Sequence, residues 1–378
     1  MKAVELFSGI GGFRLACDNK NIRTVFANDI KTLACDVYAS QFGTSVLHRG
    51  DIKDFFDKIP DHDLLTAGFP CQPFSSAGKK EGIRDPRGTL FQSIVKTLDK
   101  NKPKYFILEN VKRLLSMENG EHFATILQEL STLGYCVEWR LINAIHFGLP
   151  QNRQRLFITG IRDHEPKIRL LPKSDIDQLS SGHLILARDP SRWQEINVHG
   201  KAFPNWGLAK EGKFLGCNVN KFSDAAPPVL LRDILSSEVP SDFDFTETTL
   251  SWLANNTPVN RYYQGVEIIS NQGGGARMGY TIYGINGVSP TLTASTSRHY
   301  ERYKVGEKFR RLTNYEYARI QGFPDHHCQV VSTYNQYELY GNAVPPPMVE
   351  WILGRIFPDK NEDLWPAINQ LEIFDHAN

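Results

Sequence analysis

A cysteine between two prolines is the first residue of this sequence that suggests chemistry. Cys71 lies in GFPCQPFSSAG, residues 68 to 78, directly after an apolar run that is typical of a buried strand. A cysteine that only packs in a core needs no stiffened turn, whereas a nucleophilic thiolate must be aimed. A free thiol has a pKa of about 8.5, so a helix start or nearby arginines would have to favour the thiolate. We therefore interpret Cys71 as a candidate nucleophile.

Three further charged residues, one acid and two arginines, could assist a nucleophilic cysteine. Glu109 ends the apolar run YFIL, so the sequence predicts a partly buried carboxyl with a raised pKa that can donate a proton. Arg153 and Arg155, in QNRQR, precede another strand and are spaced to face the same way. They are also compatible with ordinary ion pairs, and the residues alone leave both interpretations open.

A nucleoside pocket is suggested by a glycine-rich turn and two acids. The turn FSGIGG, residues 7 to 12, lets backbone approach a ligand closely. Asp29 follows the second predicted strand and could accept from ribose hydroxyls, while Asp51 follows the third and could accept from an adenine amino group, with Ile52 packing on the ring. The sequence contains neither G-x-G-x-x-G nor G-x-x-x-x-G-K-[ST], which disfavours dinucleotide and P-loop sites.

The elements that must position these residues alternate regularly over the first 160 residues. Helical spacing over 90–98 and 123–133 lies between strand-like runs, which predicts an α/β fold with a mostly parallel sheet and helices on both faces. The special residues follow the strand ends, and ligands bind at that edge of open α/β sheets. The predicted strands are residues 3–7, 24–27, 45–48, 63–69, 104–108, 136–143 and 155–160.

The remaining chain is less regular. Residues 163–308 are rich in Gly, Pro and scattered aromatics and predict few elements. Order returns where Thr313 and Glu316 form a capping box. A last helix is expected after Val344, with prolines confined to its start, and the tail from Asp359 onward is expected to be peripheral.

The composition indicates a cellular compartment but no particular binding partner. The formal net charge is +1, and the six cysteines form no C-x-x-C pair. No signal peptide and no apolar run of about 18 residues is found, so we expect a cytoplasmic protein with free thiols and no membrane contact. The triplet His326-His327-Cys328 lacks a distant second ligand pair, so no metal is expected.

One stretch is locally basic. Residues 298–311 hold six Lys or Arg against two Glu. A solvated surface loop is one interpretation, but the aromatic residues Tyr300, Tyr303 and Phe309 between the charges favour a nucleic-acid contact.

A set of motifs together resembles a known family. FSGIGG, GDI, GFPCQPFS, ENV, QNRQR, SPTLTAS, RLTNYEYARIQGFPD and GNAVP occur in the order seen in DNA cytosine-5 methyltransferases, over residues 4 to about 356. The chain is similar to the prokaryotic enzymes of restriction–modification systems. The resemblance implies a Rossmann-like methyltransferase sheet and a smaller, irregular target-recognition domain.

The resemblance also implies a mechanism. The target cytosine is flipped out of duplex DNA, and the Cys71 thiolate adds to C6. Glu109 hydrogen-bonds to or protonates N3, and Arg153, with Arg155 second, holds the base and stabilises charge. C5 then takes the methyl group of S-adenosylmethionine, which leaves S-adenosylhomocysteine, without a metal.

The same resemblance assigns the cofactor pocket. One position departs from the family pattern, since Asp29 stands where the family usually has Glu, which is one methylene longer. A longer or water-mediated ribose contact is therefore expected. The implied cofactor residues are Phe7, Ile10, Gly11, Gly12, Asp29, Ile30, Asp51, Ile52, Pro70, Leu90, Asn342 and Ala343.

Domain boundaries follow from the same comparison. Residues 1–162 and 341–378 would form the catalytic domain, and 163–340 the recognition domain and hinge, within which 163–227 is a possible insertion. The candidate DNA contacts are Ser75, Gln272, Arg277, Arg298 and His299.

Double-stranded DNA is the expected partner, bound by a monomer in the bacterial cytoplasm at the nucleoid. A cognate restriction endonuclease would act on the same site without a stable complex. Three alternatives remain: a transfer-RNA cytosine methyltransferase, expected to carry a Cys-Phe-Thr motif that this chain lacks; a silent DNA-binding or antirestriction protein, expected to have lost catalytic residues; and a nicotinamide-dependent oxidoreductase.

Overall fold

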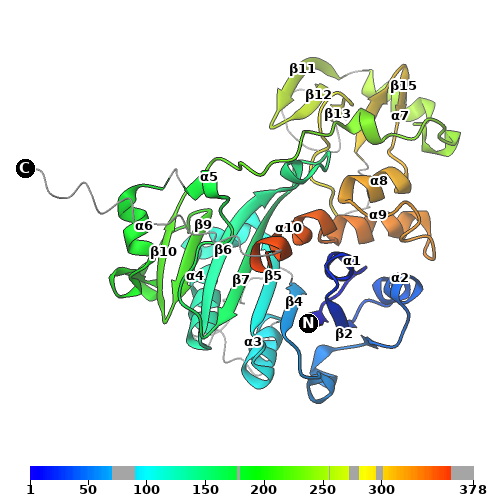
Figure 1. Ribbon diagram of the computed structural model, residues 1–378. Coiled ribbons are helices and arrows are strands. Elements are labelled where there is room, and N and C mark those ends of the chain that lie inside the picture. The colour runs from blue at the N-terminus through cyan, green and yellow to red at the C-terminus, as the bar shows by residue number, and fades with distance from the viewer. Residues whose placement is uncertain (70–89, 177–178, 255, 272–280, 295–300, 359–378) are drawn as a thin grey trace, which may run out of the picture.

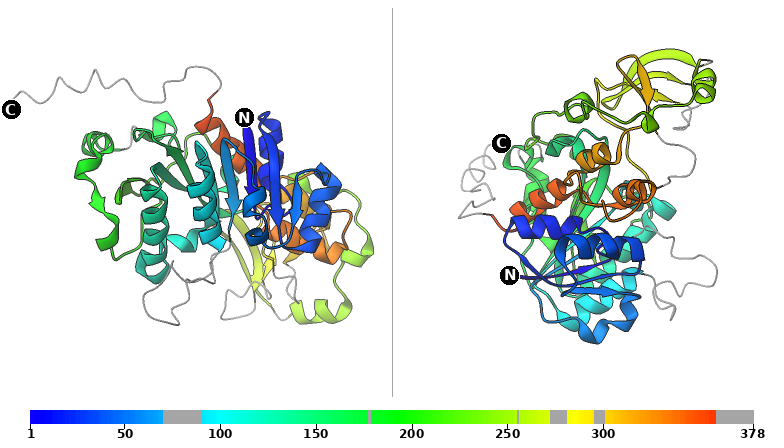
Figure 2. Two further views of the ribbon diagram at one scale, coloured as in Figure 1. Left: turned by 90° about the horizontal axis from the view of Figure 1, so that it is seen from below. Right: turned by 90° about the vertical axis from the view of Figure 1, so that its right-hand side faces the viewer.

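The computed structural model describes residues 1–69, 90–176, 179–254, 256–271, 281–294 and 301–358. Within these residues the strands form a ten-stranded sheet and a five-stranded sheet. Figure 1 shows the large sheet in one lobe with the N-terminus and the small sheet in a second lobe. The helices α8 (Asn314–Gln321) and α9 (Thr333–Asn342) lie between the two lobes, as the right-hand view of Figure 2 also shows.

The large sheet is parallel over its first half and antiparallel over its second. Its order is β3-β2-β1-β4-β5-β7-β6-β9-β10-β8, and β3 to β5 pair in parallel while every later pairing is antiparallel. The expectation of a mostly parallel sheet is therefore wrong for this second half, which is built from hairpin-like neighbours rather than helical crossovers. The strands are β1 Lys2–Leu6, β2 Arg23–Asp29, β3 Leu47–Arg49, β4 Leu64–Gly68, β5 Tyr105–Val111, β6 Tyr135–Asn143, β7 Gln154–Arg162, β8 Gln194–Glu195, β9 Trp206–Lys210 and β10 Lys213–Cys217.

Helices cover both faces of this sheet, as predicted. Val4 and Leu6 of β1 pack in a core with α3 (Leu90–Asn101) and α4 (Glu121–Thr132). Ala3, one residue earlier, packs on the other face with α1 (Gly12–Asn19) and α10 (Pro346–Ile356). Because both faces are covered, consecutive residues of β1 and β4 are buried instead of alternating between buried and exposed. The remaining helices are α2 Thr32–Phe42, α5 Lys173–Ile176, α6 Ser181–Ala187 and α7 Glu247–Leu253.

The small sheet and α8 form a second core. Thr313 and Glu316 make the predicted capping box at the start of α8. The Glu316 carboxylate also accepts two bonds of 2.8 Å from the buried guanidinium of Arg310. Tyr303 is fully buried, so it and Arg310 belong to the core, and the prediction that this part of the basic stretch contacts nucleic acid is wrong. The strands are β11 Thr257–Tyr263, β12 Val266–Asn271, β13 Ile282–Tyr283, β14 Arg302–Val305 and β15 Lys308–Arg310, in sequence order across the sheet.

Three described strands within residues 163–227, β8, β9 and β10, extend the large sheet. The hairpin β9–β10 pairs with β6, and the indole of Trp206 donates to the buried Glu138 carboxylate at 2.9 Å. Glu211 and Gly212 form its two-residue turn with φ of 49° and 76°, a turn type that fits the twist of a hairpin.

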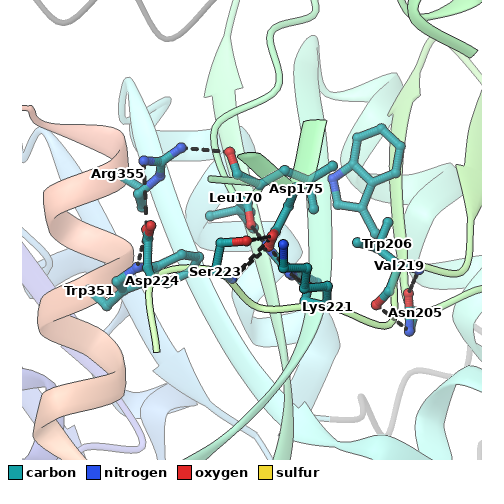
Figure 3. Close-up of polar contacts among 12 residues, drawn as sticks. Leu170, Asp175, Asn205, Trp206, Val219, Lys221, Ser223, Asp224, Trp351 and Arg355 are labelled. Atoms are coloured by element: carbon teal, nitrogen blue, oxygen red, sulfur yellow. Dashed lines mark hydrogen bonds and ion pairs between the residues drawn. The ribbon is translucent and has the colours of Figure 1, made fainter. Parts of the chain in front are cut away.

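A polar cluster fastens this segment to β6 and to α10 (Figure 3). The carboxylate of Asp175 pairs with Arg140 of β6 at 2.9 Å and accepts the backbone N–H of Ser223 at 3.0 Å. Trp351 of α10 donates to Asp224 at 3.2 Å, as Figure 3 shows. Arg355 of the same helix donates through Nε to the carbonyl of Arg169 at 2.6 Å. These contacts hold the described part of this segment against β6 and α10.

Candidate active site

The glycine turn between β1 and α1 requires its glycines for different reasons. Gly11 caps α1 with φ 85°, and a Cβ there would lie 2.3 Å from the ring of Phe42. A Cβ on Gly12 would lie 2.1 Å from the carbonyl oxygen of Val344, so only glycine permits this approach of α1 to the chain before α10. The turn is therefore fixed by packing as well as by any ligand.

Asp29 holds this turn at the end of β2. Its Oδ2 accepts the backbone N–H of Gly9 and its Oδ1 accepts that of Lys31, both at 2.8 Å. The side chain is largely buried, at 8% exposed. In this chain the shorter acid thus orients the glycine turn, while each oxygen keeps a further lone pair for a ligand.

Asp51 follows β3 in the same way. Its Oδ1 accepts the backbone N–H of Lys53 at 3.0 Å and caps a short 3₁₀ turn that begins at Ile52. Ile52 is 2% exposed and packs in the main core. The cap leaves the second oxygen of Asp51 available to a ligand.

One cavity of about 490 Å³ collects these residues at the carboxyl edge of the parallel strands. Gly11 is not among the residues that line this cavity, and Pro70 lies outside the described residues. The predicted cofactor residues that line it are Phe7, Ile10, Gly12, Asp29, Ile30, Asp51, Ile52, Leu90, Asn342 and Ala343.

Other lining residues were not among the predicted cofactor contacts. Ser8, Gly9, Asn28 and Gly50 stand beside residues already chosen at the strand ends, so the same signal extends to them. Leu339, Gly341 and Val344 come from α9 and the chain after it, which no local pattern connects to the first strands. The others are Phe13, Lys31, Ala34, Gly68, Phe69, Asn110 and Val111.

Glu109 and Arg155 form the polar end of this cavity. Arg155 Nε lies 2.8 Å from Glu109 Oε1, and the two side chains are 12% and 11% exposed. Burial raises the pKa of Glu109, and the nearby charges of Arg155 and Arg153 oppose this only in part. An ideal Cβ on Gly68 would lie 3.5 Å from Oε2, so the glycine leaves room beside this oxygen. The arrangement places a carboxyl with a raised pKa at the polar end of the cavity.

Arg153 is placed differently from what we expected. Its guanidinium donates to the main-chain carbonyls of Leu292, Gly341 and Ala343 at 2.9 to 3.0 Å, and the residue is 1% exposed. It lines the cavity while it ties β7 to distant segments. The geometry therefore favours Arg155, which we had placed second, as the arginine that faces a base.

Several predicted residues cannot be placed. Phe69, the last residue described before the cysteine segment, lines the cavity, and its carbonyl accepts from Asn110 Nδ2 at 2.9 Å. Those that lie outside the described residues are Cys71, Ser75, Gln272, Arg277, Arg298 and His299.

The described part of the chain contains neither a candidate metal site nor a helix that could span a membrane. No group of three or more His, Cys, Asp or Glu side chains there could hold a metal ion. His327 instead approaches the carbonyl of Ile10, and Cys328 is buried. Across the same residues, no helix has the length and apolar character needed to cross a membrane.

Known proteins are similar to this chain in sequence. The C-5 cytosine-specific DNA methylase family matches residues 1–358. The Type II methyltransferase M.HaeII of Haemophilus aegyptius is 32% identical over 379 residues, covering 99% of each chain. M.HhaI of Haemophilus parahaemolyticus is 29% identical over 360 residues, covering 94% of each. M.NgoBI of Neisseria gonorrhoeae is 46% identical over 166 residues, which are 44% of this chain and 52% of that one.

Solved structures agree in fold. The Dnmt2 methyltransferase of S. pombe superposes with a TM-score of 0.61 at 21% identity, covering 93% of this chain and 97% of that one. The Entamoeba histolytica methyltransferase EhMeth gives 0.60 at 17% identity, covering 96% and 99%.

Proposed function

The chain belongs to the C-5 cytosine-specific DNA methylase family and methylates C5 of cytosine in DNA, and we propose that the cavity beside Glu109 is where it does so. One observation carries the proposal. The buried Glu109–Arg155 pair shares a single cavity with the glycine turn, Asp29 and Asp51. A proton donor for a base and a set of nucleoside acceptors therefore meet in one place.

The cofactor end of the cavity fits S-adenosylmethionine, which this family uses in general. A volume of about 490 Å³ falls within the range of small-molecule sites. The carboxylates of Asp29 and Asp51 retain acceptor capacity for ribose hydroxyls and an adenine amino group. Ser8 Oγ is buried with no partner among the described residues, so a polar ligand atom would satisfy it. When bound, the cofactor supplies an electrophilic methyl group.

The other end receives the flipped-out cytosine. Glu109, whose pKa is raised by burial, donates a hydrogen bond or its proton to N3 of the base. Arg155 holds the carboxyl through Oε1, which leaves Oε2 facing the space that Gly68 keeps open. Negative charge then does not accumulate on the ring when the nucleophile adds.

Cys71 is the proposed nucleophile, in accordance with the covalent addition that is general to the family. A bond forms between its sulfur and C6, and the electron pair of the C5–C6 double bond makes C5 nucleophilic. After methyl transfer the C5 proton leaves, and the sulfur–C6 bond breaks to restore the double bond. The cysteine is thereby regenerated.

The DNA backbone is proposed to lie across a second hollow of about 260 Å³. This hollow shares Val111 and Arg155 with the main cavity, so it borders the place where the base would enter. Lys112, Arg113 and Arg155 line it, and no carboxylate does so among the described residues, which suits phosphodiesters. The remaining lining residues are Asn152, Gln154, Gln264 and Thr291.

We also propose the biological setting from the relatives. Similarity to Type II methyltransferases supports a role in protecting bacterial DNA from a cognate endonuclease. In this proposal the protein acts as a monomer in the cytoplasm, at the nucleoid. The parts of residues 272–300 that are not described, with Gln272, Arg277, Arg298 and His299, remain our candidates for base readout, together with Ser75.

The test is methyl transfer from tritiated S-adenosylmethionine to duplex DNA and, in parallel, to transfer RNA. We expect label in the duplex and none in the RNA, and bisulfite sequencing of DNA from expressing cells should identify one methylated sequence. Label in transfer RNA alone would contradict the proposed substrate.

A further inference from the structure

His327 makes a buried contact with the glycine turn that the reaction scheme does not use. The residue is 1% exposed, and its Nε2 lies 2.7 Å from the carbonyl oxygen of Ile10. A carbonyl oxygen only accepts, so Nε2 must carry the proton, which fixes the tautomer of the neutral ring. Nδ1 is buried and has no partner within the described residues. The bond to Ile10 is thus the one polar contact of this imidazole there.

Neighbouring residues hold the ring in place. Its centroid lies 4.8 Å from that of Phe323 and 6.0 Å from that of Phe42. The side-chain amide of Gln41 donates to the His327 carbonyl at 2.9 Å. Burial lowers the pKa of His327, which keeps the ring neutral near pH 7. The donor therefore has a defined position against the turn.

The contact joins parts of the chain that are far apart in sequence. His327 lies between α8 and α9, and α8 is tied to the small sheet through the Glu316–Arg310 pair. Ile10 lines the cavity, and its neighbour Gly9 is held by Asp29 from the end of β2. The turn is thus hydrogen-bonded to two separate elements, one of which leads to the small sheet.

We propose that His327 is a positioning residue for the cofactor. By fixing the Ile10 carbonyl, its Nε2–H keeps the backbone of residues 8–12 in the shape that receives S-adenosylmethionine. This inference rests on the proposed function, because it requires that the cavity binds this cofactor.

Calorimetric binding of S-adenosylhomocysteine to the full chain, without DNA, tests the inference. His327→Phe keeps an aromatic ring but removes the donor, and we expect the Kd to rise about tenfold. His327→Gln places an amide Nε2 the same number of bonds from Cβ, and it should restore binding to within about threefold. His326→Phe is the matched control, since this adjacent histidine is exposed and packs on Tyr315 instead.

Activity gives an independent readout. His327→Phe should raise the KM for S-adenosylmethionine by a similar factor and leave the KM for DNA and the kcat at saturating cofactor within about twofold. If His327→Phe does not fold, His327→Met, also without a donor, replaces it.

The possible outcomes separate the two proposals. Equal Kd values for the wild type and the donor-free variant would overturn the role of His327, as would equal weakening by Phe and Gln, which would assign the effect to ring packing. A wild type that binds no S-adenosylhomocysteine would instead contradict the proposed function.

Discussion

Arg155 and Glu109 form a nearly buried ion pair, with Nε 2.8 Å from Oε1, whereas Arg153 directs its guanidinium to three main-chain carbonyls. The two arginines of the QNRQR motif therefore have different roles. Arg155 acts on the carboxyl that would face the base, and Arg153 joins strand β7 to the segments around residues 292 and 341–343.

Substitution of each arginine should separate these roles. We expect Arg155→Ala to lower kcat about a hundredfold or more, because the charge beside Glu109 is lost. Arg153→Ala should lower the free energy of unfolding by about 3 kcal/mol or more, because three carbonyls lose their donor. Single-turnover kinetics and urea denaturation measure the two effects. A fully stable Arg153→Ala protein, or one whose only defect is kcat, would contradict this division.

Asp29 should act on cofactor binding more than on turnover. Asp29→Ala removes the acceptor for the N–H groups of Gly9 and Lys31 as well as any ribose contact, so the KM for S-adenosylmethionine should rise about tenfold with a smaller effect on kcat. Asp29→Asn keeps one side-chain carbonyl oxygen, so its KM for S-adenosylmethionine should lie between those of the wild type and Asp29→Ala. An unchanged KM in Asp29→Ala would remove Asp29 from the pocket.

The strand-end pattern explains why much of the site was predictable. Parallel strands deliver their carboxyl ends to one edge, so Asp29, Asp51 and Glu109 had to meet once the strands were recognised. The helices were equally accessible, because α3 and α4 carry regular apolar spacing. The predictions that were wrong concern contacts between residues that are distant in sequence. Nothing near Arg153 indicates that its partners lie 139 to 190 positions away.

The hairpin β9–β10 was missed although it has a local signal. Glu211-Gly212 separates two short apolar runs, which is typical of a two-residue hairpin turn. Its attachment to β6 was not visible in sequence, because it depends on Gly207, where a Cβ would lie 2.3 Å from the Trp139 ring. The prediction of a nucleic-acid contact at Arg310, in the basic stretch 298–311, was wrong for a related reason, because Arg310 pairs with Glu316 only in the folded chain.

Glu5 should make stability depend on pH. It is buried in β1, accepts a hydrogen bond from Tyr38 at 3.2 Å, and burial raises its pKa to about 8. Between pH 4.5 and 8 the folded state therefore binds more protons at this site than the unfolded state, and the contribution of Glu5 to stability falls as the pH rises. The loss is about 1.4 kcal/mol per pH unit within this window.

Glu5→Gln removes this titration and isolates the effect. We expect urea denaturation at pH 5, 6, 7 and 8 to show that the free energy of unfolding of Glu5→Gln rises relative to that of the wild type at each step. All other titrating groups are the same in the two proteins, so their effects cancel in the difference. A difference that does not change with pH would mean that Glu5 titrates alike in both states.

Asp175 should be important for stability but not for chemistry. It is fully buried and pairs with Arg140, so Asp175→Ala leaves an unpaired buried guanidinium and should cost about 3–5 kcal/mol of folding free energy. Asp175→Asn should cost less, because its amide oxygen still accepts a bond. Thermal unfolding measures both, and the KM for S-adenosylmethionine should stay unchanged below the Tm. An Asp175→Ala variant that is as stable as the wild type would show that the cluster does not fasten residues 163–227 to the sheet.

The covalent step offers the most direct test of the central claim. Fluorine at C5 cannot leave as a proton, so the sulfur–C6 bond should persist after methyl transfer to 5-fluorocytosine. With S-adenosylmethionine and a duplex carrying this base at the target, we predict a denaturation-resistant protein–DNA adduct. Glu109→Gln should form it more slowly, and Cys71→Ala should not form it while still binding the duplex. An adduct that survived Cys71→Ala, or none with the wild type, would contradict the account.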